Sequence, residues 1–165
     1  MEFTIYNNKF EKETLTMIYD FFDFHAGLVS SKDELTNEDR LKEIINEWIS
    51  ENHELYLIKI RKEIIGFCHL WYKGEMVCWV EDLYIIPEER GKGYGSYSLK
   101  LAENIVRLKP GYQAISLDVS IRNQTAIDLY FKNGYDSISL ITLRKEFYEN
   151  KRDKTVNFLE HNFFY

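Results

Sequence analysis

Residues 83–96 read LYIIPEERGKGYGS, in which an apolar run enters a turn with glycines at positions 91, 93 and 95. Residues 95–108 carry apolar side chains at helical spacing, so a strand, a turn and a helix are expected in direct succession. The first amides of a helix point outward, and glycines let a ligand approach the backbone closely. Arg90 and Lys92 add positive charge beside the turn. The stretch therefore predicts a binding site for a diphosphate.

The type of diphosphate stays open at this point. The phosphate-binding loop of nucleoside triphosphatases does not fit, because no Gly-Lys-Ser or Gly-Lys-Thr stands at the required spacing. A dinucleotide fold needs a third glycine at position 96, which is Ser96. Asp118 nevertheless follows a strand roughly 20 residues on, where a ribose-binding acid would stand. A nicotinamide enzyme thus remains an alternative, as does a tight turn that binds nothing.

The rest of the chain predicts a single α/β (α+β) domain over residues 1–165. Periodicity indicates helices at 12–25, 36–49, 95–108 and 123–133, and strands at 3–6, 55–61, 64–72, 76–86, 114–119, 137–143 and 156–164, the last of which also permits a helix. These elements form a mixed, mostly antiparallel central sheet of about seven strands flanked by four helices. Gly27 and Gly134 are expected to end helices, and Thr36 and Asn123 to cap them. Strand, helix and strand over 76–119 imply a right-handed parallel crossover.

Composition excludes several classes of function. The net charge of −6 argues against nucleic-acid binding. It mildly favours a cationic small-molecule partner, although a well-solvated surface would explain the same charge. Cys68 and Cys78 form no CxxC pair, and the four histidines have no metal-ligand spacing, so neither a disulfide nor a metal site is expected. The N-terminus has no signal-peptide pattern, and no apolar run approaches the ~20 residues of a membrane span. We therefore expect a cytoplasmic protein without a membrane partner.

Two motifs together resemble those of the GNAT (Gcn5-related) N-acetyltransferases. The first, Arg90-x-x-Gly93-x-Gly95, is similar to the coenzyme A loop of that family, and some thirty residues later comes the second, Asn123-x-x-Ala126-x-x-Leu129-Tyr130-x-x-x-Gly134-Tyr135. The resemblance implies an acyl-CoA N-acyltransferase-like fold whose sheet is splayed in the middle. It also implies transfer of an acetyl group from acetyl-CoA to a primary amine, by direct attack in a ternary complex and without a metal.

The resemblance assigns the cofactor site residue by residue. The gap between strands 76–86 and 114–119 would hold the pantetheine arm, with the backbone of residues 83–85 pairing with it like an added strand. Amides of residues 90–96 would hold the pyrophosphate, and Asn123 would contact the arm as well as cap its helix. The expected acetyl-CoA-binding residues are Leu83, Tyr84, Ile85, Arg90, Gly91, Lys92, Gly93, Tyr94, Gly95, Ser96, Asn123 and Tyr130.

Catalytic roles follow from the chemistry that the resemblance implies. Tyr130 is the expected general acid, because a phenol of pKa about 10 can protonate a departing thiolate whose thiol has a pKa of about 8.5. The incoming ammonium must lose a proton, and the pair Glu81 and Asp82 resembles the arrangement in diamine (polyamine) acetyltransferases. Because side chains alternate along a strand, only one of the two can reach the cleft. Glu81 is favoured as the base, Asp82 is the second choice, and a carboxylate merely paired with a surface lysine remains the alternative.

The acceptor site is expected at the first helix pair and its connection, with the connection at 147–155 as a second wall. Aromatic and acidic residues there would attract a small cationic amine of the polyamine or aminoglycoside type: Phe21, Phe24, His25 and Glu34. An acceptor on a protein or peptide, or a non-catalytic acetyl-CoA sensor, remains an alternative function. The resemblance also leaves a homodimer open, with the tail 148–165 placed in a partner subunit.

Overall fold

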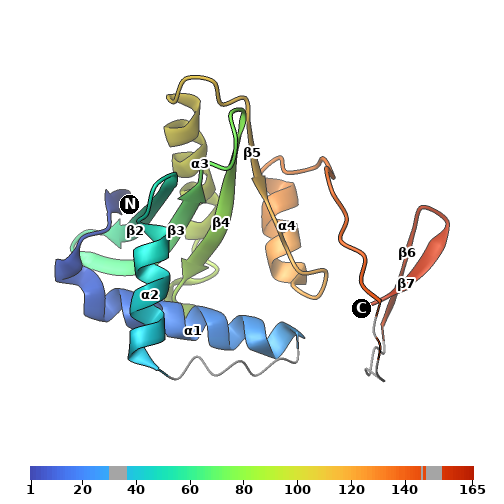
Figure 1. Ribbon diagram of the computed structural model, residues 1–165, viewed down its shortest axis with the longest axis horizontal. Helices are drawn as coiled ribbons and strands as arrows, with labels where there is room; N and C mark the ends of the chain where they lie inside the picture. The colour runs from blue at the N-terminus through green and yellow to red at the C-terminus, as the bar shows by residue number, and fades with distance from the viewer. Residues whose placement is uncertain (30–36, 146, 148–153) are drawn as a thin grey trace. The chain divides into compact units, whose positions relative to one another are not determined.

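The computed structural model describes residues 1–29, 37–145, 147 and 154–165 (Figure 1). The chain divides into two compact units, Met1–Asp118 and Val119–Tyr165, and each is described here by itself. In the described residues, the first unit contains a five-stranded sheet with three α-helices, and the second contains one α-helix and a two-stranded hairpin. The four predicted helices and five of the predicted strands are therefore present in the described residues, and the seven observed strands form two sheets and not one.

The main sheet has the strand order β1-β2-β3-β4-β5. Its strands are β1 (Glu2–Ile5), β2 (His53–Ile60), β3 (Glu63–Trp71), β4 (Val77–Ile85) and β5 (Ala114–Leu117). Pairing is antiparallel from β1 to β4, whereas β5 runs parallel to β4 and is reached through a helix. The mixed sheet, the antiparallel meander and the parallel crossover expected from the sequence are thus confirmed.

The three helices of the first unit are α1 (Glu11–Val29), α2 (Glu38–Trp48) and α3 (Tyr94–Arg107). The expectation that Gly27 ends the first helix is wrong, since α1 continues to Val29. One internal glycine costs only about 1 kcal/mol, which a 19-residue helix tolerates. The cap of α2 is Asn37, whose Oδ1 accepts from the Asp39 amide at 3.0 Å. The predicted cap, Thr36, lies outside the described residues.

Helices α1 and α2 lie on one face of the main sheet and α3 on the other (Figure 1), and an apolar cluster fills the space under each layer. One packs α1 and α2 against the sheet and includes Ile18, Trp48, Leu55, Phe67 and Tyr84. The other packs α3 against the opposite face and includes Cys68, Leu70, Cys78, Val80 and Ala102. Both cysteines are free and buried, as expected, and burial raises the pKa of each thiol well above its ordinary value. Side chains on one face of the sheet thus pack against α1 and α2, and side chains on the other face pack against α3.

The second unit begins with α4 (Gln124–Lys132). The predicted cap is confirmed, because Asn123 Oδ1 accepts from the Ala126 amide at 3.2 Å. The helix ends before Gly134, which has a left-handed φ of 91°. Within the described residues, the predicted strand at 137–143 is absent: this segment pairs with no other strand, and Leu140 is 76% exposed.

A hairpin closes the described chain where a single strand at 156–164 was expected. Strands β6 (Thr155–Phe158) and β7 (His161–Phe164) pair antiparallel, with Phe158 opposite His161. The two turn residues, Leu159 and Glu160, have φ values of 48° and 64°. This is the left-handed conformation that two-residue hairpin loops require. The turn lacks the usual glycine or asparagine, which is why the sequence did not indicate it.

Candidate functional site

Strand β4 leaves its parallel neighbour halfway along its length. Residues 77–80 pair with β5, from Val77 opposite Ala114 to Val80 opposite Leu117. Beyond them, residues 82–85 pair with β3, and residues 81–85 pair with no other strand among the described residues of the chain. The sheet is therefore open beside the second half of β4. An open strand edge offers backbone donors and acceptors to an extended ligand.

The second half of β4 begins at a β-bulge. His69 on β3 lies opposite Asp82, but the next residue, Leu70, lies opposite Val80, so Glu81 is an extra residue without a counterpart. The bulge reverses the alternation of the strand. Val80 packs in the α3 cluster, whereas Tyr84, also even-numbered, packs in the α1 and α2 cluster. The regular alternation assumed for Glu81 and Asp82 therefore does not hold at this point, and bulges of this kind often redirect side chains beside active sites.

Beyond β4, a short 3-10 helix (Pro87–Glu89) leads into the glycine turn and α3. Gly91 and Gly93 have left-handed φ values of 74° and 84°, and Gly93 is the N-cap of α3. A Cβ on either would meet no protein atom within 4 Å, so the space in front of them is open. The amides of residues 91–95 donate to no acceptor among the described residues. This is the strand, turn and helix that the sequence predicts, with an amide cradle that fits an anion.

The charged side chains of the turn have partners of their own. Arg90 donates from Nε to the Ile85 carbonyl at 2.8 Å, and its guanidinium lies 5.5 Å from the ring centroid of Phe24 and 5.4 Å from that of Tyr84. The Arg90 amide also donates, to the Pro87 carbonyl at 3.2 Å, so it is already engaged. Lys92 Nζ lies 2.8 Å from Glu89 Oε1, which raises the pKa of Lys92. Arg90 thus ties the turn to β4 and α1, and the cradle itself is made of backbone.

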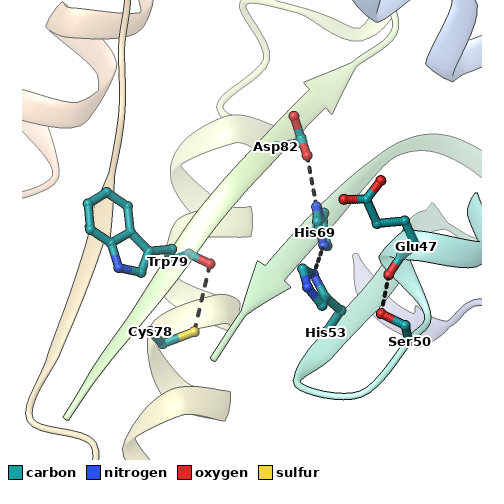
Figure 2. Close-up of polar contacts among 7 residues, drawn as sticks. All are labelled: Glu47, Ser50, His53, His69, Cys78, Trp79 and Asp82. Atoms are coloured by element: carbon teal, nitrogen blue, oxygen red, sulfur yellow. Dashed lines mark hydrogen bonds and ion pairs between the residues drawn. The ribbon is translucent and has the colours of Figure 1, made fainter. Parts of the chain in front are cut away.

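Figure 2 shows a line of three polar side chains that crosses three strands. Asp82 Oδ2 lies 2.8 Å from His69 Nδ1, and His69 Nε2 lies 2.8 Å from His53 Nδ1. His69 is 2% exposed, and the Trp48 ring stacks on it at a centroid distance of 4.8 Å. The sequence did not indicate that these two histidines lie together beside Asp82. Their spacing shows no motif, and only the strand register places His69 opposite Asp82.

Burial and neighbouring charges shift two titratable groups at this line. The pKa of Glu81 is raised, first by desolvation and then by the nearby Asp82 carboxylate, and the charge of His69 offsets this in part. The pKa of His53 is lowered, first by burial and then by His69, although Glu47 on α2 acts in the opposite direction. Glu81 therefore keeps its proton to a higher pH than an ordinary carboxyl group, and His53 releases its proton more readily than an ordinary imidazole.

The residues expected to line the acceptor site have different surroundings. Phe21 is 7% exposed and packs in the core against Phe67 and Tyr84, so its ring is structural. Phe24 is 42% exposed, and His25 is half-buried with its Nδ1 2.9 Å from the Phe21 carbonyl. The acidic candidate of the connecting segment, Glu34, lies outside the described residues, as does most of the 147–155 connection.

Two predicted site residues belong to the second unit and are described within it. Asn123 caps α4, as given above. Tyr130 is half-buried near the end of α4, with its ring 6.1 Å from that of Tyr135, and its carbonyl accepts from the amides of Asn133 and Tyr135. The first unit brings together the open strand edge, the amide cradle and the carboxylates. Asn123 and Tyr130 share one helix of the second unit.

Over residues 1–29, 37–145, 147 and 154–165, no three histidine, cysteine, aspartate or glutamate side chains are grouped to hold a metal ion. In the same part of the chain, each helix is too short or too polar to cross a bilayer.

Comparison with known proteins gives a consistent result. The family model described as "Acetyltransferase (GNAT) family" matches residues 16–135. The uncharacterized N-acetyltransferase YycN of Bacillus subtilis (strain 168) is 29% identical over 100 residues, which cover 57% of this chain and 62% of the relative. The match thus spans less than two thirds of that protein.

Solved structures share the fold at lower identity. A crystal structure of YycN superposes with a TM-score of 0.69 at 20% identity, covering 89% of this chain and 99% of that one. The aminoglycoside N-acetyltransferase AAC(6')-Iy, solved in complex with CoA, superposes with a TM-score of 0.69 at 12% identity, covering 88% of this chain and 94% of that one. At these identities the superpositions establish the fold.

Proposed function

The chain belongs to the acetyltransferase (GNAT) family, and from this premise we propose that it transfers an acetyl group from acetyl-CoA to a primary amine. One observation carries the proposal within the first unit. The amides of residues 91–95 lack protein acceptors among the described residues, and they follow directly on a strand that has left its parallel neighbour. An open strand edge beside an anion cradle suits a ligand that joins an amide-containing arm to a diphosphate, as coenzyme A does.

In this proposal, each half of the cofactor has its own residues. Backbone groups of Leu83, Tyr84 and Ile85 pair with the pantetheine amides, and the amides of residues 91–95 hold the pyrophosphate. Gly91 and Gly93 keep the space in front of the cradle open, since neither carries a side chain. Asn123, from the second unit, is assigned a contact with the arm. Bound acetyl-CoA supplies the acetyl group and a thiol leaving group, and no metal is required.

The carboxylates at the bulge handle the proton of the amine. An amine attacks only in its neutral form, so the ammonium must first lose a proton to a base. Glu81 fits this task because its raised pKa is closer to the working pH than that of an ordinary carboxyl group. Asp82, which is hydrogen-bonded to His69, is the second candidate. Tyr130 is assigned the opposite task, protonation of the departing thiolate.

The acceptor is proposed to be a small cationic amine. Glu81 and Asp82 stand side by side at the open half of β4, and the chain as a whole carries a net charge of −6. Both features attract an ammonium group. A structural neighbour named as an aminoglycoside N-acetyltransferase supports this class of acceptor. The competing function, a sensor that binds acetyl-CoA without turnover, would need neither a base nor an acid.

A thiol-release assay tests the proposal. The purified protein is mixed with acetyl-CoA and, in turn, spermidine, kanamycin and a lysine-containing peptide, while calorimetry measures the binding of CoA. We expect CoA release with at least one small amine. Binding of CoA without release with any acceptor contradicts the enzyme and supports the sensor, whereas the absence of binding contradicts the cofactor site itself.

A further inference from the structure

Two tryptophans that the proposed chemistry does not use lie side by side at the start of β4. Trp71 on β3 is directly opposite Trp79 on β4, and both side chains are half-buried. Directly opposite residues of an antiparallel pair point to the same face of the sheet. Trp71 stacks on His53 at a centroid distance of 5.2 Å, and His53 in turn stacks on His69, the partner of Asp82. The tryptophan pair therefore shares a face of the sheet with the Asp82 carboxylate.

The tryptophan pair already holds a cation of this chain. Lys73 stands in the connection between β3 and β4, and its Nζ lies 4.4 Å from the ring centroid of Trp71 and 5.9 Å from that of Trp79. In the part of the chain that the structure describes, no carboxylate forms an ion pair with this ammonium group. An ammonium group within about 6 Å of a tryptophan ring centroid is attracted by the quadrupole of the ring. The contact thus marks a place that suits an ammonium group.

This place is close to the proposed base. Figure 2 shows Trp79 and Asp82 on the same strand, with Asp82 further along it. Glu81 follows Trp79 by two residues, which is at most about 7 Å along a strand. Desolvation is the main cause of the raised pKa of Glu81, and the Lys73 ammonium is near enough to act against that rise. A positive charge on the tryptophan pair therefore lies within electrostatic reach of the carboxylate that would accept the proton of the amine.

We propose that Trp71 and Trp79 form a subsite for a second ammonium group of the acceptor, and that Lys73 occupies this subsite until the acceptor binds. One amine of a linear diamine reacts beside Glu81, while its other ammonium group replaces that of Lys73 on the rings. Lys73 is exposed and its side chain is flexible, so it can move into water without disturbing the sheet. The inference rests on the proposed function, and it narrows the acceptor to amines that carry a second positive charge.

Lys73 also acts as a competitor of the acceptor in this proposal. A group that is tethered close to its binding place has an effective concentration in the mM range. A diamine must displace the Lys73 ammonium, whereas a monoamine that reacts beside Glu81 has no second ammonium group for the rings. Loss of the Lys73 charge should therefore help diamines more than monoamines. If the contact only shields the two rings from water, its loss should leave the preference between acceptors unchanged.

The first experiment compares acetyl transfer to putrescine and to n-butylamine, which share the same carbon chain and differ by one ammonium group. We expect the wild type to prefer putrescine by about tenfold in kcat/KM. Trp79→Leu removes the aromatic face but keeps an apolar side chain, and it should lower this preference about fivefold through the KM for putrescine. Trp79→Phe keeps an aromatic face and should retain part of the preference. The KM for acetyl-CoA should stay close to the wild-type value in both variants.

The second experiment removes the competing charge. Lys73→Gln should lower the KM for putrescine about threefold, with a smaller change for n-butylamine. Lys62 is an exposed lysine in the connection between β2 and β3, so Lys62→Gln is the matched control and should behave as wild type. A KM for putrescine that is unchanged or higher in Lys73→Gln overturns the displacement of Lys73 by the acceptor.

The outcomes separate the subsite from the proposed function. A wild type that releases CoA but uses putrescine and n-butylamine equally overturns the subsite and leaves acetyl transfer standing. A preference for putrescine that survives Trp79→Leu also overturns the subsite, because the carboxylates alone then account for the preference. A wild type that releases no CoA with any small amine overturns the proposed acceptor and the subsite with it. If Trp79→Leu does not fold, Lys73→Gln, at an exposed position, decides.

Discussion

The two halves of β4 differ although they belong to one strand. Residues 77–80 all pair with β5, residues 79 and 80 also pair with β3, and Cys78 and Val80 are buried against α3. Residues 82–85 pair with β3 alone among the described strands, and the open half begins with the two adjacent carboxylates Glu81 and Asp82. The closed half contributes stability, while the open half presents backbone groups and charge to a ligand. One strand therefore serves as both scaffold and site, with the bulge at Glu81 as the boundary.

The largest effect should come from the boundary residue itself. Glu81→Gln removes the proposed base, and kcat should fall about 100-fold with little change in the KM for acetyl-CoA. Glu75 is an exposed glutamate that precedes the closed half. Glu75→Gln is therefore the matched control and should leave kcat unchanged. In the wild type, kcat/KM should rise with pH through a value above the ordinary carboxyl range, because the pKa of Glu81 is raised. If Asp82→Asn abolishes activity and Glu81→Gln does not, Asp82 is the base.

Truncation of a buried side chain in the closed half should lower stability but leave function unchanged. Val80 is 3% exposed, so Val80→Ala should lower the free energy of unfolding by about 2 kcal/mol. The KM for acetyl-CoA of the folded protein should stay within about twofold. Val77→Ala makes the same change at a half-buried position of the same half and should cost less. Urea titration measures both, and equal losses for the two valines would contradict the burial argument.

A substitution in the glycine turn that follows the open half should weaken the binding of CoA. Gly93→Ala places a side chain in the open space of the amide cradle and forces a non-glycine residue into a left-handed conformation, which costs about 1–2 kcal/mol. Gly74 has a φ of 89° and similarly open space, so Gly74→Ala is a control with the same backbone strain. Both should lower the melting temperature equally, but only Gly93→Ala should weaken CoA binding, by about tenfold. Equal CoA affinities by calorimetry would contradict the cradle.

The smallest effect concerns stability at the boundary. The pKa of Glu81 is raised in the folded state, so ionisation of this side chain destabilises the folded protein. The destabilisation is fully present at a pH above the raised pKa. Glu81→Gln should therefore raise the melting temperature slightly, by about 1 °C, at neutral pH. The gain should disappear at a pH below the ordinary carboxyl pKa, where the wild-type side chain is protonated in both states. Calorimetric scans at the two pH values check the sign, and a destabilised variant at neutral pH would contradict it.

Local patterns were sufficient to predict most of the fold. The meander, the helices and the strand, turn and helix at 83–96 all depend on residues that are close in sequence. The same holds for the cap at Asn123, where a side-chain oxygen satisfies a local requirement. Even where a boundary differed, as at Gly27, the helix itself was predicted. The proposed cofactor cradle is local in the same sense.

What the sequence did not indicate depends on register between distant segments. The bulge exists because His69 and Leu70 lie opposite Asp82 and Val80, a mismatch that no single strand displays. The contact of Asp82 with His69 follows from that register, and so the two histidines looked unremarkable. The hairpin turn at Leu159 depends on a left-handed backbone at residues that rarely adopt it. Long-range pairing and unusual turn chemistry thus limited the prediction.

The bulge also determines which face of the sheet each later residue of β4 occupies. Because one extra residue separates Val80 from Asp82, Leu83 and Ile85 pack toward α3 while Tyr84 packs toward α1 and α2. Deleting position 81 would not simply remove a carboxylate, since it would turn the remainder of the strand over and exchange the two hydrophobic layers. Replacing its side chain disturbs neither layer. The backbone of position 81 therefore holds the two layers in register, while its side chain is left to the chemistry of the site.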